Sequence, residues 1–253
     1  MMSKTILSVK DLTKVYDDKA VVDGISFEVK EGEIFGILGP NGAGKTTTLE
    51  MIETMRSIDG GAVTVDGLDV ASQPSAVKRI IGVQPQAAAF QEKTKLTEII
   101  ELFSAAYGEK VDPLEFLRDV NLDEKANAYA EQLSGGQRQR LSIAAALVHS
   151  PKVFFMDEPT TGLDPQARRN LWELTRDVQK RGVTVLLTTH YLDEAETLCD
   201  RVAIMDHGKI IALDTPKNLI KQLLQRGFTK KETVQQANLE DVFIDLTGKG
   251  LRD

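Results

Sequence analysis

The stretch Gly39-Pro40-Asn41-Gly42-Ala43-Gly44-Lys45-Thr46 decides the fold of this chain. It fits the pattern G-x-x-x-x-G-K-[S/T], whose glycines allow backbone N–H groups to curl around phosphate groups. The apolar run at 33–38 predicts a buried strand before it, and a helical pattern begins at Lys45 and continues through Ile52. A helix N-terminus directly after the turn adds a positive dipole, so we predict a phosphate-binding loop.

Two side chains of this loop have the chemistry that a nucleoside triphosphate needs. The Lys45 ammonium would reach the β- and γ-phosphates, and the Thr46 hydroxyl would bind Mg²⁺. A chance glycine-rich turn is disfavoured because a predicted strand precedes the stretch and a predicted helix follows it. The predicted nucleotide-binding residues of the loop are Gly39, Pro40, Asn41, Gly42, Ala43, Gly44, Lys45, Thr46 and Thr47.

A second stretch, V-F-F-M-D-E at 153–158, reads as an apolar strand that ends in two carboxylates. Asp157 would hold Mg²⁺ directly or through water, and Glu158 would activate a water molecule for attack on the γ-phosphate. Alone, the pattern more often marks a strand that runs into a solvated turn. Beside a phosphate loop, it favours a catalytic pair of carboxylates.

Outward from these stretches, strand and helix patterns alternate, which predicts a largely parallel sheet covered by helices. Rough alternation at 6–16 and 21–29, and a hairpin around Asp66-Gly67, predict an added antiparallel sheet. Between 87 and 150 the pattern is helical. The predicted helices are 96–107, 113–120, 136–148, 167–178 and 192–198, and the further predicted strands are 62–65, 153–156, 183–188, 202–205 and 209–213.

Composition limits the class of protein. The 253 residues, 42% hydrophobic and 27% charged, predict a soluble globular protein with one large domain or two small ones. A net charge of −7 disfavours non-specific nucleic-acid binding, which needs many Lys and Arg contacts to phosphate. The single cysteine, Cys199, excludes an intramolecular disulfide and is expected to be buried. No secretory apolar region or membrane-spanning run is present, so we expect a cytoplasmic protein that meets a membrane through a partner.

A third stretch, Leu133-Ser134-Gly135-Gly136-Gln137, opens the predicted helix at 136–148. Two adjacent glycines at a helix N-terminus offer backbone N–H groups to an anion, and Ser134 adds a hydroxyl donor. The chain therefore has two phosphate cradles but one lysine-bearing loop. The simplest interpretation is that the second cradle, made by Ser134, Gly135, Gly136 and Gln137, serves a nucleotide held by another subunit.

These three stretches, in this order, resemble the ATP-binding subunit of an ABC (ATP-binding cassette) transporter over about residues 4–220. The resemblance implies an α/β fold with a P-loop NTPase core and a mostly parallel sheet. An N-terminal antiparallel β-subdomain and an α-helical subdomain nested at about 87–150 complete this ABC ATPase fold. The implied ATP-binding domain is 1–220, and 221–253 is a short C-terminal extension. ATP and Mg²⁺ are the implied cofactors.

The resemblance assigns two more nucleotide contacts. Tyr16 lies where the family has an aromatic ring that stacks on adenine, although a core or edge tyrosine is the alternative. Asp164, in Gly162-Leu163-Asp164-Pro165, matches the loop that crosses to the opposite site. It would also be the N-cap of the helix that Pro165 begins.

Two further residues match family positions near the γ-phosphate. Gln86 matches the glutamine that joins the Mg²⁺ shell and faces the membrane partner, and it fits better than the nearby Gln84 because it follows the proline. His190 matches the switch histidine that contacts the γ-phosphate. His149 and His207 lack such context and are expected at the surface.

The resemblance also implies partners and a direction of transport. Two copies, or one copy and a paralogue, would sandwich two ATP molecules, and hydrolysis would reopen the dimer. A separate transmembrane permease subunit would dock in a groove near Gln86, with Phe90 and the helix from Leu96 as walls, at the cytoplasmic face of the membrane. The segment 238–248 is similar to that of bacterial drug and antibiotic exporter ATPases and predicts a short amphipathic helix, so we expect export of a drug, antibiotic, lipid or similar compound.

Three alternatives stay open. A soluble ABC ATPase of DNA repair or chromosome organisation usually carries a coiled-coil or zinc-bearing insertion, whereas only 47–132 separate the phosphate loop from the third stretch here. A translation factor of the ABC type carries two cassettes on one chain. A non-catalytic nucleotide sensor is disfavoured by Glu158 and by the intact third stretch.

Overall fold

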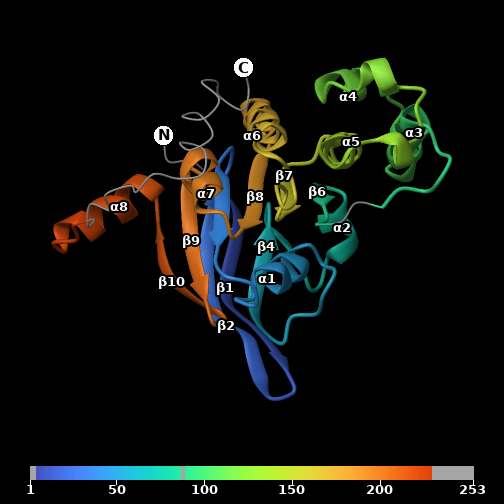
Figure 1. Ribbon diagram of the computed structural model, residues 1–253. Helices are drawn as coiled ribbons and strands as arrows, with labels where there is room; N and C mark the ends of the chain where they lie inside the picture. The colour runs from blue at the N-terminus through green and yellow to red at the C-terminus, as the bar shows by residue number, and fades with distance from the viewer. Residues whose placement is uncertain (1–3, 87–88, 230–253) are drawn as a thin grey trace, which may run out of the picture. The chain divides into compact units, whose positions relative to one another are not determined.

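The computed structural model describes residues 4–86 and 89–229 (Figure 1). By its internal contacts the chain divides into two units, Met1–Leu219 and Ile220–Asp253. The first unit holds both sheets and helices α1 to α7, and helix α8 (Pro216–Gln225) begins in it. The amphipathic helix predicted at 238–248 lies outside the described residues.

The larger sheet has six strands, and its order confirms the predicted, mostly parallel arrangement. Only the edge pair of β9 and β10 is antiparallel. The central strands are buried over their whole length, as is usual for parallel strands covered on both faces. In order across the sheet, the strands are β10 (Lys209–Asp214), β9 (Arg201–Asp206), β3 (Ile34–Leu38), β8 (Thr184–Thr189), β7 (Val153–Asp157) and β6 (Ile81–Gln84).

The smaller sheet has four antiparallel strands from the N-terminal part of the chain, as predicted. The predicted hairpin at Asp66 and Gly67 is present, and both residues have positive φ, 46° and 82°. Two positive φ values in a two-residue turn match the twist of the flanking strands. The order is β2 (Lys19–Lys30), β1 (Thr5–Tyr16), β4 (Gly60–Val65) and β5 (Leu68–Asp69).

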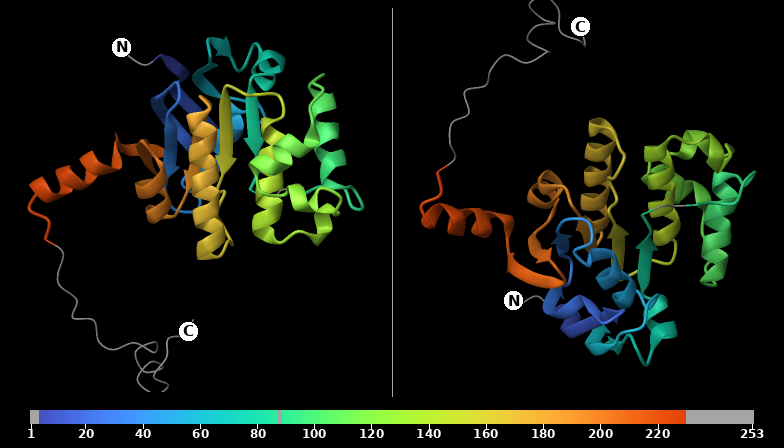
Figure 2. Two further views of the ribbon diagram at one scale, coloured as in Figure 1. Left: turned by 90° about the horizontal axis from the view of Figure 1, so that it is seen from above. Right: turned by 60° about the horizontal axis from the view of Figure 1, so that its bottom comes forward.

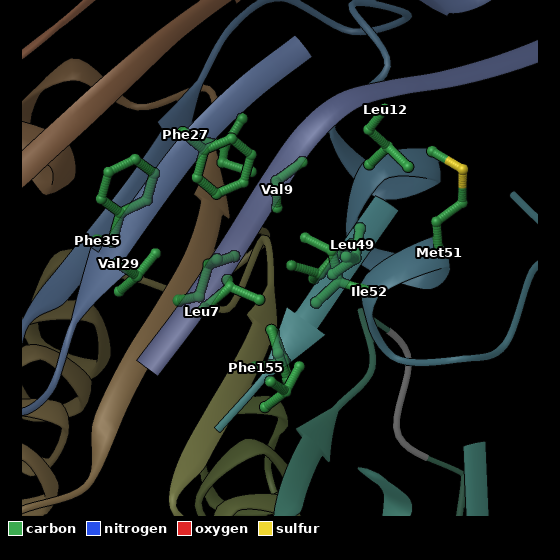
Figure 3. Packing of buried hydrophobic residues seen from close by; sticks show 14 of the residues in the cluster. Leu7, Val9, Leu12, Phe27, Val29, Phe35, Leu49, Met51, Ile52 and Phe155 are labelled. Carbon is green, nitrogen blue, oxygen red and sulfur yellow. The ribbon is translucent and has the colours of Figure 1, made fainter. Parts of the chain in front are cut away.

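One face of the six-stranded sheet packs against helix α1 (Lys45–Ile52) and the smaller sheet (Figure 3). Phe35 and Phe155 point into this core, and the Phe35 ring stacks on Phe27 of β2 at 5.2 Å between centroids. Leu49 and Ile52 of α1 fill the space between the sheets. This packing fixes α1, and therefore the loop before it, against the ends of the central strands.

The other face of the sheet carries helices α6 (Pro165–Lys180) and α7 (Leu192–Leu198) (Figure 2). Alternate strand residues such as Ile34, Phe154 and Val185 form this second core, because successive side chains of a strand point to opposite faces. Cys199 is buried in the same core, which confirms the expectation for the single cysteine.

Helices α3 (Leu96–Ala106), α4 (Pro113–Asp119) and α5 (Gly135–Leu147) have a core of their own, as expected of a nested helical subdomain. Helix α5 joins this core to the sheet: Leu141 packs inside the helical part, whereas Ile143 packs against the sheet. Helix α5, which begins at the third stretch, therefore packs in both the helical core and the core of the six-stranded sheet.

Among the described residues, the sequence did not predict strand β6, helix α2 (Pro74–Lys78), helix α8 or the two short 3-10 helices at Asp123–Lys125 and Ala130–Gln132. Strand β6 has four residues and α2 has five, too few to establish a periodic pattern. Strand β6 nevertheless matters for the site, because it is the edge strand that leads to Gln86.

Candidate active site

Four strands bring the predicted site residues to one edge of the sheet. The phosphate loop follows β3, Asp157 is the last residue of β7, His190 directly follows β8, and Gln86 lies two residues after β6. These four strands are mutually parallel, so their carboxyl ends share an edge. Ligands of open α/β sheets bind at this edge.

The phosphate loop needs its glycines for two physical reasons. A Cβ atom on Gly39 would lie 2.2 Å from the Met205 carbonyl oxygen, and one on Gly44 would lie 2.5 Å from the Val21 carbonyl oxygen. Gly44 also has φ of 101°, a conformation that side-chain-bearing residues rarely adopt. Neighbouring backbone therefore comes close enough to this loop that no side chain fits at either position.

A pocket of about 310 Å³ opens beside this loop. It gathers the loop, Gln86 and Glu158, as the sequence predicted, and adds Val21 of β2. Three predicted loop residues do not line it: Gly39 and Pro40 present their carbonyl groups to Lys45, and Ala43 is buried. The lining residues are Val21, Asn41, Gly42, Gly44, Lys45, Thr46, Thr47, Gln86 and Glu158.

Lys45 is 4% exposed, and the loop holds its ammonium group in place. Its Nζ donates to the Gly39 carbonyl at 2.9 Å and to the Pro40 carbonyl at 3.1 Å. The same nitrogen lies 3.1 Å from Oε1 of Glu158. An ammonium group has three donors, so the two carbonyls and the carboxylate account for all of them.

The Glu158 carboxylate lies between the Lys45 ammonium group and the His190 ring. Its Oε1 faces Lys45, and its Oε2 lies 3.1 Å from Nδ1 of His190. Burial raises the pKa of Glu158, but Lys45 and His190 more than offset this and hold that pKa below its ordinary value. The carboxylate is therefore ionised at neutral pH, the form that a general base needs. Its backbone has φ of 45°, a strained conformation typical of functional sites.

Thr188 of β8 is a residue of this site that the sequence analysis missed. Its hydroxyl donates to Oδ1 of Asp157 at 2.5 Å and accepts a hydrogen bond from the Glu158 backbone N–H at 3.0 Å. It thereby orients both carboxylates at once. The available signal was a threonine near the end of the strand before His190, at a position that only the strand pairing places opposite Asp157.

The residues present fit a magnesium ion. Thr46 Oγ1 lies 3.3 Å from Oδ1 of Asp157, and Gln86, whose side chain carries an amide oxygen, lines the same pocket as Thr46. Mg²⁺ prefers such oxygen ligands and commonly takes one or two carboxylates together with substrate phosphates. In the described part of the chain, no three His, Cys, Asp or Glu side chains cluster as metal ligands.

The third stretch lies in a different pocket, of about 230 Å³. Ser134 is the N-cap of α5. Its hydroxyl accepts a hydrogen bond from the Gln137 backbone N–H, and the Gln137 side-chain oxygen accepts one from the Ser134 backbone N–H. Asp164 lines the same pocket and caps α6 by accepting from the Ala167 N–H at 2.9 Å, as predicted. No lining residue is shared with the phosphate-loop pocket.

Tyr16 does not line either of these two pockets. Its hydroxyl accepts a hydrogen bond from Arg56 at 2.6 Å, and Lys14 and Arg56 lie over its ring at 5.4 and 5.6 Å from the centroid. The ring is thus partly exposed and engaged by two cations. Its stacking on adenine stays a prediction.

The two remaining histidines differ from each other. His207 is exposed at the tip of the β9–β10 hairpin, as expected. The expectation for His149 was wrong: its ring stacks on Tyr107 at 3.7 Å between centroids, and its Nε2 lies 2.9 Å from the Ile81 carbonyl oxygen. It is a half-buried link between the helical part and β6, and burial lowers its pKa.

The fold and the site together define a P-loop ATPase with a nested helical subdomain and a second pocket at the N-terminus of α5. Residues 22–161 match the family model described as ABC transporter. The Nod factor export ATP-binding protein I of Rhizobium etli is 42% identical over 88% of this chain and 72% of its own length. The linearmycin resistance ATP-binding protein LnrL of Bacillus subtilis is 40% identical over 86% of this chain and 72% of its own length.

A solved ATP-binding subunit of an ABC transporter superposes with a TM-score of 0.79 at 31% identity. The superposition covers 96% of this chain and 100% of the solved subunit. This chain belongs to the ABC transporter family, as an ATP-binding and ATP-hydrolysing subunit.

Proposed function

We propose that this subunit powers the export of a drug, antibiotic, lipid or similar compound through a separate transmembrane permease. The names of its relatives, which refer to Nod factor export and linearmycin resistance, support export. No helix among the described residues is long and apolar enough to cross a membrane. The proposed place of the subunit is peripheral, at the cytoplasmic face of the cell membrane.

The observation that carries the proposed mechanism is the separation of the two anion cradles. The phosphate loop and the Ser134 cradle line different pockets of one chain. A second ATP-binding subunit, identical or paralogous, would place its Ser134 cradle and Asp164 against the nucleotide on the first. ATP would then close the dimer, and hydrolysis would open it. In this proposal 1–220 form the ATP-binding domain, with the helical subdomain at about 87–150, and 221–253 form an extension.

The chemistry follows from the distances around Glu158. ATP would bind with its β- and γ-phosphates at Lys45 and the backbone N–H groups of the loop. Glu158 would take a proton from a water molecule whose oxygen bonds to the γ-phosphorus as the bond to the ADP oxygen breaks. His190 would hold Glu158 and the γ-phosphate in line. A magnesium ion held by Thr46, Asp157 and Gln86 would neutralise phosphate charge.

The permease would dock beside Gln86, on the outer face of α3. Leu102 is 61% exposed there, and Phe103 packs edge-on against Phe90 at 6.4 Å between centroids while staying partly exposed. In this proposal the exposed apolar side chains of α3 bind the membrane subunit. Loss of permease binding on Leu102→Asp, with ATPase activity of the free subunit unchanged, is the expected result.

The trans arrangement is tested by comparing Lys45→Ala with Ser134→Arg. Lys45→Ala removes the charge opposite the phosphates and should weaken ATP binding to the monomer. Ser134→Arg should leave monomer binding intact and abolish dimer closure and hydrolysis, because Ser134 serves the partner's nucleotide. Equal loss of monomer ATP binding in both variants would contradict the trans arrangement. The measurements are nucleotide titration at low protein concentration, size-exclusion chromatography and phosphate release.

A further inference from the structure

The segment that carries His190 is fastened to helix α6 by a set of polar contacts outside the nucleotide pocket. Helix α6 begins after Asp164, and Arg168 and Trp172 lie one and two turns farther on, on the same face of the helix. Both of their side chains reach the segment 189–194. These contacts therefore link the start of α6, where Asp164 is proposed to face the other subunit, to the segment that carries His190.

Glu194 of α7 is the centre of these contacts. Its side chain is fully buried, and its Oε1 accepts a hydrogen bond from Nε1 of Trp172 at 3.0 Å. Burial raises its pKa, and the neighbouring groups of Thr189, Trp172 and Thr160 oppose this shift. A buried carboxyl group is costly unless a specific arrangement of donors requires it. The proposed chemistry does not use this carboxyl group.

The polar groups that face Glu194 come from both sides of the catalytic centre, although its Oε2 makes no hydrogen bond. Thr189 is the last residue of β8, and its hydroxyl also accepts from the Tyr191 backbone N–H at 2.9 Å. Thr160 lies two residues after Glu158 in the turn that follows β7. Glu194 thus lies near the residue before His190 and near the turn after Glu158, and its one hydrogen bond from a side chain comes from Trp172.

Arg168 holds the same segment from outside. Its guanidinium lies 4.2 Å from the Tyr191 ring centroid and donates to Oδ2 of Asp193 at 3.2 Å. The Tyr191 ring in turn packs against the His190 ring, with 4.1 Å between centroids. Tyr191 and Asp193 are therefore both restrained by α6, and His190 packs on the restrained Tyr191 ring.

We infer that Glu194, held by Trp172, is a positioning residue that fixes the His190 segment against α6 and thereby keeps His190 beside Glu158. This inference rests on the proposed role of His190 and adds a residue to it. Because α6 starts at Asp164, the same contacts connect the loop facing the second subunit to the switch histidine of this subunit. Glu194 lies outside the lining of the phosphate-loop pocket, so it acts on the rate and not on ATP binding.

The test compares Glu194→Ala, Glu194→Gln and Trp172→Phe in steady-state ATP hydrolysis by the full chain. Glu194→Ala should lower kcat roughly ten- to hundredfold, the cost of a small misplacement of a catalytic group. KM for ATP should stay within about twofold, because the phosphate loop is untouched. Glu194→Gln should restore most of kcat, since its amide oxygen can still accept from Trp172. Trp172→Phe, which keeps a ring but removes the donor, should lower kcat in the same direction.

Two controls separate positioning from a general structural role. Glu196→Ala, an exposed carboxylate on the same helix, should leave kcat unchanged. In a His190→Ala background, Glu194→Ala should lower kcat by less than about twofold further, because its effect passes through His190.

Parent-like kcat in Glu194→Ala, a raised KM in place of a lowered kcat, or an undiminished further loss in the His190→Ala background would each overturn the inference. A parent-like kcat in His190→Ala itself would instead refute the proposed role of His190. If Glu194→Ala does not fold, Trp172→Phe decides the question: a parent-like kcat in this variant would overturn the inference, and a lowered kcat with unchanged KM would support it.

Discussion

Replacing Glu158 with glutamine tests the proposed catalytic centre directly. The amide keeps the length of the side chain, and its oxygen can still accept from Lys45, which lies 3.1 Å from Oε1. The change removes the negative charge and the ability to take a proton from water. A positioned general base contributes about 10²–10⁴-fold in rate, which corresponds to about 3–5 kcal/mol of activation free energy. We expect kcat to fall by that factor.

ATP binding should survive the same substitution or become tighter. In the parent, the Glu158 carboxylate competes with the phosphates for the Lys45 ammonium, whereas a neutral amide competes less. The dimer should therefore close on ATP and stay closed, because the step that opens it is blocked. Phosphate release measures the rate, and size-exclusion chromatography with ATP and Mg²⁺ should show a long-lived dimer in Glu158→Gln and a transient one in the parent.

The matched control is Glu173→Gln, which neutralises an exposed carboxylate on α6 and should change neither measurement. Hydrolysis by Glu158→Gln within about threefold of the parent would refute the reasoning, since a general base contributes far more than that. Glu158 would then be a strand-end carboxylate paired with Lys45, and His190 would be the next residue to test as the base.

Three further predictions follow from contacts of the described residues. Thr188→Val should lower kcat about tenfold and raise the Mg²⁺ requirement, because Asp157 and the Glu158 backbone lose a shared hydroxyl; unchanged Mg²⁺ dependence would contradict this. Gly36→Ala should lower the free energy of unfolding by about 1–3 kcal/mol, because its Cβ would lie 2.6 Å from Cys199 Sγ, and Cys199→Ala should restore part of the loss in chemical denaturation. Burial lowers the pKa of His149 in the folded state from its ordinary value of 6.5. Neutral His149 therefore stabilises the folded state above pH 6.5, and this stabilisation is lost as the pH falls through the lowered pKa of the folded state. The drop in Tm on acidification should be smaller in His149→Phe.

The sequence alone was sufficient to locate the stretches whose residues are neighbours along the chain, and their proposed chemistry stays a prediction. The phosphate loop, the strand ending in Asp157 and the Ser134 cradle are each continuous, because one strand-to-helix turn or one helix N-terminus makes each of them. The long apolar periodic segments were predicted for the same reason: α6 and α7 cover the sheet with faces that repeat within one helix.

Strand pairing and packing decided what the sequence could not. Thr188 became part of the site because β8 pairs beside β7. Gln86 was assigned to the site from the sequence, but the strand that carries the chain to it, β6, was recognised only in the structure. Glu194 reads as one more polar residue of a short helix until Trp172, 22 positions away, is seen to donate to it. Turns, helix N-termini and periodic apolar faces are made by residues that are neighbours in the chain, so the sequence predicts them. A contact between distant residues exists only after the backbone has folded into sheets and layers, so the sequence does not predict it.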